Sequence, residues 1–247
     1  MRCKRISELA GLAFTLLVAT TGALAHTTVR DQMTEGKSGD TALKIGHGCT
    51  TAGGIKRGVI AQSVTWANVN PVITASDSST ISALSEVITQ GSLLGLIKPI
   101  QSRDIFARQG VKVDANSNVI AFHGRDGALP PTFVGRVPVQ ISAVNFETAS
   151  CAKKLLVKVA IADICVATAP TLFEGKVNLW IPSNGSSYAT IGASRNIDGV
   201  GAPATLTINR DLVANPLEQA CGAGIDVTVT PSAAEVDANL PIPLFWR

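Results

Sequence analysis

Alternating apolar residues, frequent turn residues and few aromatic residues together predict an all-β protein, a β-sandwich of the immunoglobulin-like kind. Valine, isoleucine and leucine fall on every second position in four runs, at 137–141, 155–161, 176–181 and 227–229. A period of two with β-branched residues is typical of half-buried strands. Clusters of glycine, asparagine, aspartate, serine and proline separate these runs. Aromatic residues make up only 4% of the chain, so valine, isoleucine, leucine and alanine must form the core.

The first 25 residues have the three parts of a secretory signal peptide. Arg2, Lys4 and Arg5 are basic, residues 9–18 form an apolar run, and residues 23–25 read Ala-Leu-Ala, a small-x-small cleavage site. We therefore expect the mature chain to begin at His26 and to be periplasmic or secreted. The apolar run is too short to span a bilayer, so we expect no stable membrane insertion after cleavage. A retained signal anchor is the alternative.

Charge argues against a nucleic-acid partner. The predicted signal carries three basic residues and one acidic residue, so its removal lowers the formal net charge from +3 to about +1. The basic isoelectric point of the full chain therefore owes much to the segment that is removed. Such a balance is not typical of proteins that bind nucleic acids or anionic membrane surfaces.

Four cysteines remain after cleavage: Cys49, Cys151, Cys165 and Cys221. An even number in an exported chain predicts two disulfides, and four cysteines allow three pairings. The chain has no Cys-x-x-Cys spacing, which argues against a metal cluster and against thiol catalysis.

We expect residues 26–247 to form a single β-sandwich domain with an elaborated insertion at about 70–130. A second small subdomain there is the alternative. One short helix is predicted within 79–97, because apolar residues at Ile81, Leu84, Val87 and Ile88 recur at helical spacing. Strand and loop is the other interpretation of this segment.

His26 is the first candidate for chemistry, because cleavage makes it residue one. Its free α-amine and its imidazole then offer two nitrogens to one metal ion. The amine has a reference pKa near 8 and loses its proton at modest cost. Among common divalent ions, Cu(II) best suits amine and imidazole nitrogens. The alternative is a histidine that follows the cleavage site by accident.

Pairing of the N-terminal strand with residues 41–47 would bring His47 close to His26 and complete a three-nitrogen site. A structural turn histidine beside a disulfide is the alternative for His47. Glu35 then lies at or near the turn, where it would be a carboxylate ligand only if the strand bends back; an exposed turn glutamate is the commoner case. His123 is expected in an exposed loop.

These features resemble the YcnI-like domain, an exported family. The shared features are cleavage before a strand that begins with histidine, a turn at 35–36, the stretch Gly-His-Gly-Cys at 46–49, a late strand 159–165 that ends in cysteine, and a strand 178–182 that bears a tryptophan. The resemblance covers residues 26–60 and 135–185. It implies a β-sandwich that binds Cu(II) through its N-terminal histidine, with a copper-import or copper-chaperone protein as partner.

The resemblance also implies roles for individual residues. His26 is implied as the copper anchor, Glu35 as a carboxylate ligand and Trp180 as the aromatic residue near the metal. It further implies the disulfide Cys49–Cys165, and with it Cys151–Cys221. The chain departs from the family at Gly46, where many members have proline, and it lacks the proline-rich approach to the middle strands.

The main hypothesis is a non-catalytic, exported copper-binding protein that captures Cu(II) through its N-terminal histidine and stores or delivers it. The alternative is a non-catalytic structural or adhesive β-sandwich protein at the cell surface, which needs no site. A copper-dependent oxidase would need His47 or His123 across from His26, together with a flat aromatic surface that the sequence does not show. The chain has neither a Gly-x-Ser-x-Gly nor a His-Glu-x-x-His motif.

Overall fold

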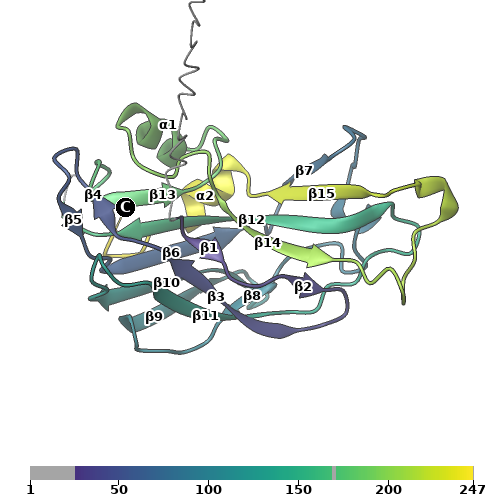
Figure 1. Cartoon of the computed structure of the whole chain (residues 1–247), viewed down its shortest axis with the longest axis horizontal. Helices are drawn as coiled ribbons and strands as arrows, with labels where there is room; N and C mark the ends of the chain where they lie inside the picture. Colours follow the sequence, from purple (N-terminus) through teal and green to yellow (C-terminus); the bar gives the residue numbers. More distant parts are fainter. Residues whose placement is uncertain (1–25, 169–170, 247) are drawn as a thin grey trace, which may run out of the picture.

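The computed structural model describes residues 26–168 and 171–246 and has an all-β architecture with two short α-helices (Figure 1). Two β-sheets pack face to face around a shared apolar core, so the predicted β-sandwich is confirmed. The predicted signal peptide, residues 1–25, lies outside the described residues.

The smaller sheet has four antiparallel strands. In spatial order they are β1 (Thr28–Val29), β3 (Gly39–Ile45), β11 (Gly135–Ile141) and β8 (Ile97–Pro99). The alternation in β11 has the predicted effect, because Val137, Val139 and Ile141 are buried, whereas Arg136 and Gln140 are exposed and Pro138 is half-buried.

The larger sheet has nine strands. Its main path is β2 (Met33–Thr34), β14 (Ala204–Asn209), β12 (Ala152–Ile164), β6 (Ala61–Trp66), β10 (Val119–Gly127) and β9 (Phe106–Val113), and its branches are β13 (Val177–Trp180), β15 (Ile225–Thr230) and β7 (Val72–Ala75). A separate two-stranded ribbon joins β4 (Cys49–Thr50) to β5 (Lys56–Arg57).

Strand β12 organises the larger sheet because it is hydrogen-bonded on both sides. Its first half pairs with β14 and with β15, and its second half pairs with β6 and with β13. Both faces of its second half are buried, and every residue there except Asp163 is apolar, as expected for a strand covered on both sides. Val159 and Ile161 face the smaller sheet, whereas Ala160, Ala162 and Ile164 face the opposite way.

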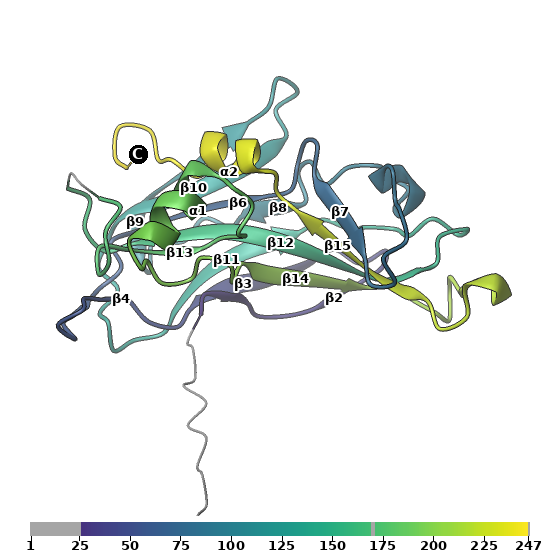
Figure 2. The same ribbon diagram turned by 90° about the horizontal axis from the view of Figure 1, so that it is seen from above.

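Two helices cover this opposite face. They are α1 (Ser187–Ser194) and α2 (Ala233–Asn239), and Figure 2 shows them over the region of β13 and β12. Each begins at a serine whose hydroxyl accepts a hydrogen bond from the backbone three residues on, Ser186 for α1 and Ser232 for α2. Two single turns of 3₁₀-helix, Leu84–Glu86 and Gln219–Cys221, complete the regular structure that is described.

The helix predicted within 79–97 is wrong apart from the single turn at Leu84–Glu86. Leu84, Val87 and Ile88 are buried, so the spacing identified the inward-facing residues but not the backbone. Ile88 instead forms an isolated β-bridge with Phe146. Consecutive β-branched residues at 87–89 and glycine at 91 do not favour continuing a helix.

Residues 70–130, the segment predicted as an insertion, contain several strands. They supply β7, β8, β9 and β10, which pair with strands of both main sheets. Hydrogen-bonded pairing of β10 with β6 places this segment within the larger sheet itself. Connections without helix or strand remain at 76–83 and 100–105.

Tyr188, the only tyrosine of the chain, gives a direct test of the packing between α1 and the C-terminal segment. Its side chain is buried and stacks on Trp246 at 5.2 Å between ring centroids. Burial, followed by the negative charge of Asp237, raises the pKa of Tyr188 to about 12 from 10.0.

We therefore expect the tyrosinate absorbance of the folded protein to titrate near pH 12. The folded-state pKa exceeds the unfolded one, so the unfolding free energy should fall as pH rises above 10, and Tyr188→Phe should remove that part of the fall. A tyrosinate midpoint near 10 in the folded protein would contradict this packing.

Candidate metal centre

Strand β1 places His26 beside the glycine-rich segment that carries His47. The two strands β1 and β3 are antiparallel, with Thr28 opposite Lys44. Continued by two residues, this register sets His26 opposite Gly46, the neighbour of His47. The predicted pairing of the N-terminal strand with residues 41–47 is therefore confirmed.

Trp180 connects the two histidines. The His26 ring stacks on the indole with 4.8 Å between centroids and 29° between planes, and the His47 ring meets it edge-on at 5.9 Å and 86°. The indole is 1% exposed, and its Nε1 donates a hydrogen bond of 2.7 Å to Asp163. The structure thus brings three of the four predicted metal-site residues together around one fixed ring.

Asp163 is a fully buried carboxylate beneath this cluster. Its Oδ2 accepts hydrogen bonds from Thr27 Oγ1 (2.5 Å) and Trp180 Nε1 (2.7 Å), and its Oδ1 accepts one from Gln62 Nε2 (2.8 Å). Burial raises the pKa of Asp163, while these hydrogen bonds and the charge of His47 oppose the rise. The carboxylate therefore ties β1, β6 and β13 to β12.

Sequence reasoning missed Asp163, although a signal was present. It is the single charged residue in the apolar stretch 159–165. A charged residue inside a buried strand is rare unless it is paired or hydrogen-bonded. That pattern would have marked Asp163 as a residue with required partners.

His47 has one ring nitrogen engaged and one available. Its Nδ1–H donates a hydrogen bond to the carbonyl of Gly48, and this bond leaves Nε2 unengaged. Gly48 is required by sterics, because a Cβ there would lie 1.8 Å from the Arg57 carbonyl oxygen. The close approach of β5 thus fixes the backbone next to His47.

Asp198 is a second acidic residue that the sequence did not single out. Its Oδ2 lies 3.9 Å from His47 Nε2, and its side chain is 48% exposed. Its backbone carbonyl accepts a hydrogen bond of 2.7 Å from the amide of Leu179. The loop after α1 is thereby held beside Trp180, with a carboxylate directed at the free nitrogen of His47.

A disulfide joins the backbone of this centre to the end of β12. Cys49 and Cys165 are bonded with 6.1 Å between their Cα atoms, and Cys151 and Cys221 form the second disulfide with 5.1 Å. The pairing implied by the family resemblance is confirmed. The first disulfide fixes the segment after His47 against the strand that carries the buried carboxylate.

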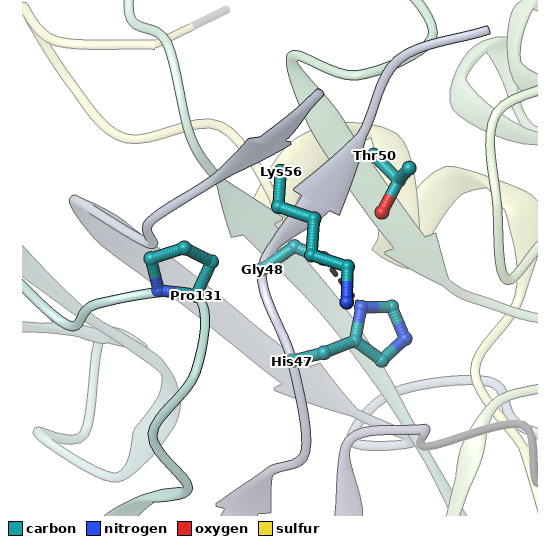
Figure 3. A pocket seen from close by; sticks show the side chains of 5 residues that line it. All are labelled: His47, Gly48, Thr50, Lys56 and Pro131. Atoms are coloured by element: carbon teal, nitrogen blue, oxygen red, sulfur yellow. Dashed lines mark hydrogen bonds between the residues drawn. The ribbon is translucent and has the colours of Figure 1, made fainter. Parts of the chain in front are cut away.

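A hollow of about 270 Å³ opens beside His47. Gly48, Thr50, Lys56 and Pro131 complete its lining, and Figure 3 shows the Lys56 side chain extending toward the imidazole. Thr50 and Lys56 are a cross-strand pair of the β4–β5 ribbon. The centre is therefore accessible from solvent on the His47 side.

The side chains around Trp180 include few possible metal donors. Among residues 26–168 and 171–246, no group of three or more His, Cys, Asp or Glu side chains is arranged to hold a metal ion. The two imidazoles and the carboxylate of Asp198 supply one donor each. The α-amine of His26 becomes a further donor only when the peptide bond to Ala25 is cleaved.

Glu35 lies elsewhere, and the structure gives its carboxylate a structural role. Oε1 accepts hydrogen bonds from Phe146 N (2.7 Å) and Asn215 Nδ2 (2.8 Å), and Oε2 accepts one from Asp211 N (3.0 Å). The side chain is 9% exposed, so it is not an exposed turn residue either. Because three donors occupy it away from His26, the interpretation of Glu35 as a metal ligand is corrected.

His123 is also placed differently from the expectation. It lies within β10, opposite Ser63 of β6 and Gly110 of β9, and not in an exposed loop. Gly124 to Gly127 continue the same strand. None of the described ring contacts joins His123 to the cluster around Trp180.

No protein-family model matches the chain, and no curated protein matches it. Among solved structures, an uncharacterized protein from Nocardia farcinica, whose crystal structure is described as an immunoglobulin-like fold, is similar with a TM-score of 0.40 and 12% identity. The match covers 75% of this chain and 99% of that chain. The YcnI-like resemblance stays a prediction.

None of the helices that the structure describes is long and apolar enough to cross a membrane.

Glu35→Ala should separate stability from metal binding. It leaves three donors without their acceptor, so we expect the unfolding free energy to fall by about 2–3 kcal/mol. Because Glu35 lies outside the cluster around Trp180, we expect the folded variant and the wild type to respond alike to added Cu(II). The matched control is Glu218→Ala, an exposed glutamate whose removal should cost less than about 0.5 kcal/mol. Urea unfolding and copper titration measure the two effects, and loss of copper affinity without loss of stability would contradict the assignment.

Asp163→Ala and Asp163→Asn should have different effects on the unfolding free energy. Asp163→Ala leaves Trp180, Thr27 and Gln62 without an acceptor, so we expect a loss of about 3 kcal/mol. In Asp163→Asn the new amide can donate to Gln62 Oε1, which is buried without a partner in the described structure, if the Gln62 amide turns over. This variant should therefore fold with near wild-type stability.

The stability difference between Asp163→Asn and the wild type should also depend on pH. The pKa of Asp163 is raised in the folded protein, so its stabilising contribution is complete below 3.8 and is lost as pH rises through the folded-state pKa. The stability of Asp163→Asn relative to wild type should therefore increase from acid to neutral pH. Urea unfolding at a series of pH values measures it, and a constant or falling difference would contradict the buried position.

Proposed function

We propose that this protein is an exported, non-catalytic copper-binding protein that captures Cu(II) through His26 after signal cleavage and then stores or delivers it. The α-amine and the imidazole of an N-terminal histidine close a small chelate ring on one ion. Imidazole and amine nitrogens suit Cu(II) in a tetragonal arrangement. The observation that carries the proposal is that His26 and His47 contact the same buried indole.

The donors around Trp180 suit this chemistry. His26 would supply two nitrogens and His47 would supply Nε2. Asp198, in place of Glu35, would supply the carboxylate, since its Oδ2 lies 3.9 Å from His47 Nε2. In zinc sites, where nitrogen donors bind at about 2.0–2.1 Å, donors on opposite sides of the ion are about 4 Å apart, which is similar to this separation.

The residues beneath the donors support the proposal by limiting their motion. Chain termini are poorly ordered unless they are tied down. Here Thr27 donates to Asp163, and the Trp180 ring that stacks on His26 is held by the same carboxylate. A preorganised terminus loses less conformational entropy when it binds an ion.

Export and hand-over fit the same proposal. The N-terminal sequence is that of a secretory signal, and two disulfides are expected in the periplasm or outside the cell. The hollow beside His47 leaves one side of the centre open, where a copper-import or copper-chaperone protein would approach. Membrane insertion and nucleic-acid binding have no part in the proposal.

A Cu(II) titration of the processed protein tests it, with mass spectrometry to confirm that the chain begins at His26. We expect one equivalent bound, with nitrogen hyperfine structure in the electron paramagnetic resonance spectrum. One extra residue before His26 should weaken binding by about two orders of magnitude, or about 2.8 kcal/mol. His26→Ala should have a similar effect, and Asp198→Asn should weaken binding about tenfold.

His123→Gln is the matched histidine control and should leave the copper affinity unchanged, because His123 lies outside the cluster around Trp180. Weak or multiple binding that neither His26→Ala nor the added residue affects would overturn the proposal. The structural or adhesive role would then be favoured, and it predicts self-association without a stoichiometric metal.

A further inference from the structure

A second hollow, of about 410 Å³, lies at the free edge of the larger sheet, where β9 ends the order of the described strands. Three arginines line it from three separate segments. Arg103 comes from the connection before β9, Arg108 from β9 and Arg125 from β10. Gln101 and Gln109 also line it, but the Gln109 amide is engaged by the backbone of Ser102 and Ile100.

Two of these arginines form an unfavourable pair. Arg108 and Arg125 are directly opposite in the β9–β10 register, so their side chains share a face. Like charges opposite one another destabilise a sheet. Asp126 compensates Arg108 in part, with Oδ2 3.1 Å from Nε, but both groups are largely exposed. No ion pair is described for Arg103 or Arg125 within residues 26–168 and 171–246.

His123 also lines this hollow, two residues before Arg125 on β10 and opposite Gly110 of β9. Its ring covers Gly110 so closely that a Cβ there would be 2.7 Å from Cε1. Burial, followed by the charges of Arg125 and Lys112, lowers the pKa of His123. The positive charges of Arg125 and Lys112 therefore act on the ring in addition to its burial.

Protection of an edge strand explains only part of this arrangement. Charged residues on an edge discourage pairing with other chains. Lys112, which bonds the carbonyls of Ala238 and Asn239, and Arg108 already place charge along β9. Protection needs neither Arg103 from a separate segment nor a hollow between the guanidinium groups.

We propose that this hollow binds an oxyanion of the phosphate or sulfate class. Guanidinium groups bind such anions through paired N–H donors, and a doubly charged anion between Arg103, Arg108 and Arg125 would turn their repulsion into attraction. The neutral His123 ring contributes one N–H donor. This site is independent of copper, because its residues lie on β9, β10 and the preceding connection.

Inorganic phosphate is the first probe, added to the processed protein at constant ionic strength in chloride and followed by nuclear magnetic resonance at the His123 ring. We expect saturable shifts. Arg103→Gln/Arg125→Gln should weaken phosphate binding at least tenfold, while the control Arg136→Gln, an exposed arginine of β11, should not. Circular dichroism checks that each variant is folded.

Vesicles distinguish a lipid headgroup from the free anion. Binding to phosphatidylglycerol but not to phosphatidylcholine vesicles, lost in the double variant, would support the same site with a headgroup phosphate as its source. The proposal would be overturned if the His123 chemical shifts changed linearly with phosphate concentration, without saturation, and no vesicle binding were observed. An equal loss of binding in Arg136→Gln would also overturn it.

Discussion

The arrangement of the candidate centre depends on one buried carboxylate. Asp163 is placed inside the longest strand, on the face that looks into the sandwich, where an unpartnered charge would cost several kcal/mol. Three donors satisfy it, and each comes from a different strand or its flank: Thr27 before β1, Gln62 from β6 and Trp180 from β13. The requirement that this charge be satisfied fixes the N-terminus and the indole together. His26 and His47 contact this indole, so their positions are limited by the same hydrogen bonds.

Sequence patterns predicted the fold well where one physical rule dominated. Period-two alternation identified β11, β12, β13 and β15, and the expected N-terminal hairpin is present. The disulfide pairing followed from the family resemblance, since spacing alone left three choices. The pattern at 79–97 failed because buried apolar residues at helical spacing also suit a single 3₁₀ turn followed by a β-bridge, and local spacing does not record that Ile88 pairs with Phe146.

The site was predictable only in part, for a different reason. His26, His47 and Trp180 could be selected from the cleavage site and from the resemblance, and the structure brings them together. The role of Glu35 was misassigned and Asp198 was not singled out, because the role of each depends on contacts between residues far apart in the chain. Glu35 looks like a turn residue in sequence, yet its partners are more than 100 positions away at Phe146, Asp211 and Asn215. Asp198 becomes relevant only because the loop after α1 returns to β13.

In the proposed copper site, export and binding competence are linked by covalent chemistry. As long as residue 25 is attached, the nitrogen of His26 is an amide, which is a far weaker donor than an amine, and the chelate ring cannot close at neutral pH. The remaining parts do not depend on cleavage, because Asp163, Trp180 and the Cys49–Cys165 disulfide act on side chains and on strands that follow residue 26. Cleavage would therefore add one donor to a scaffold that is already ordered. Such a protein would leave cytoplasmic copper unbound during synthesis and would acquire its affinity in the compartment where its disulfides form.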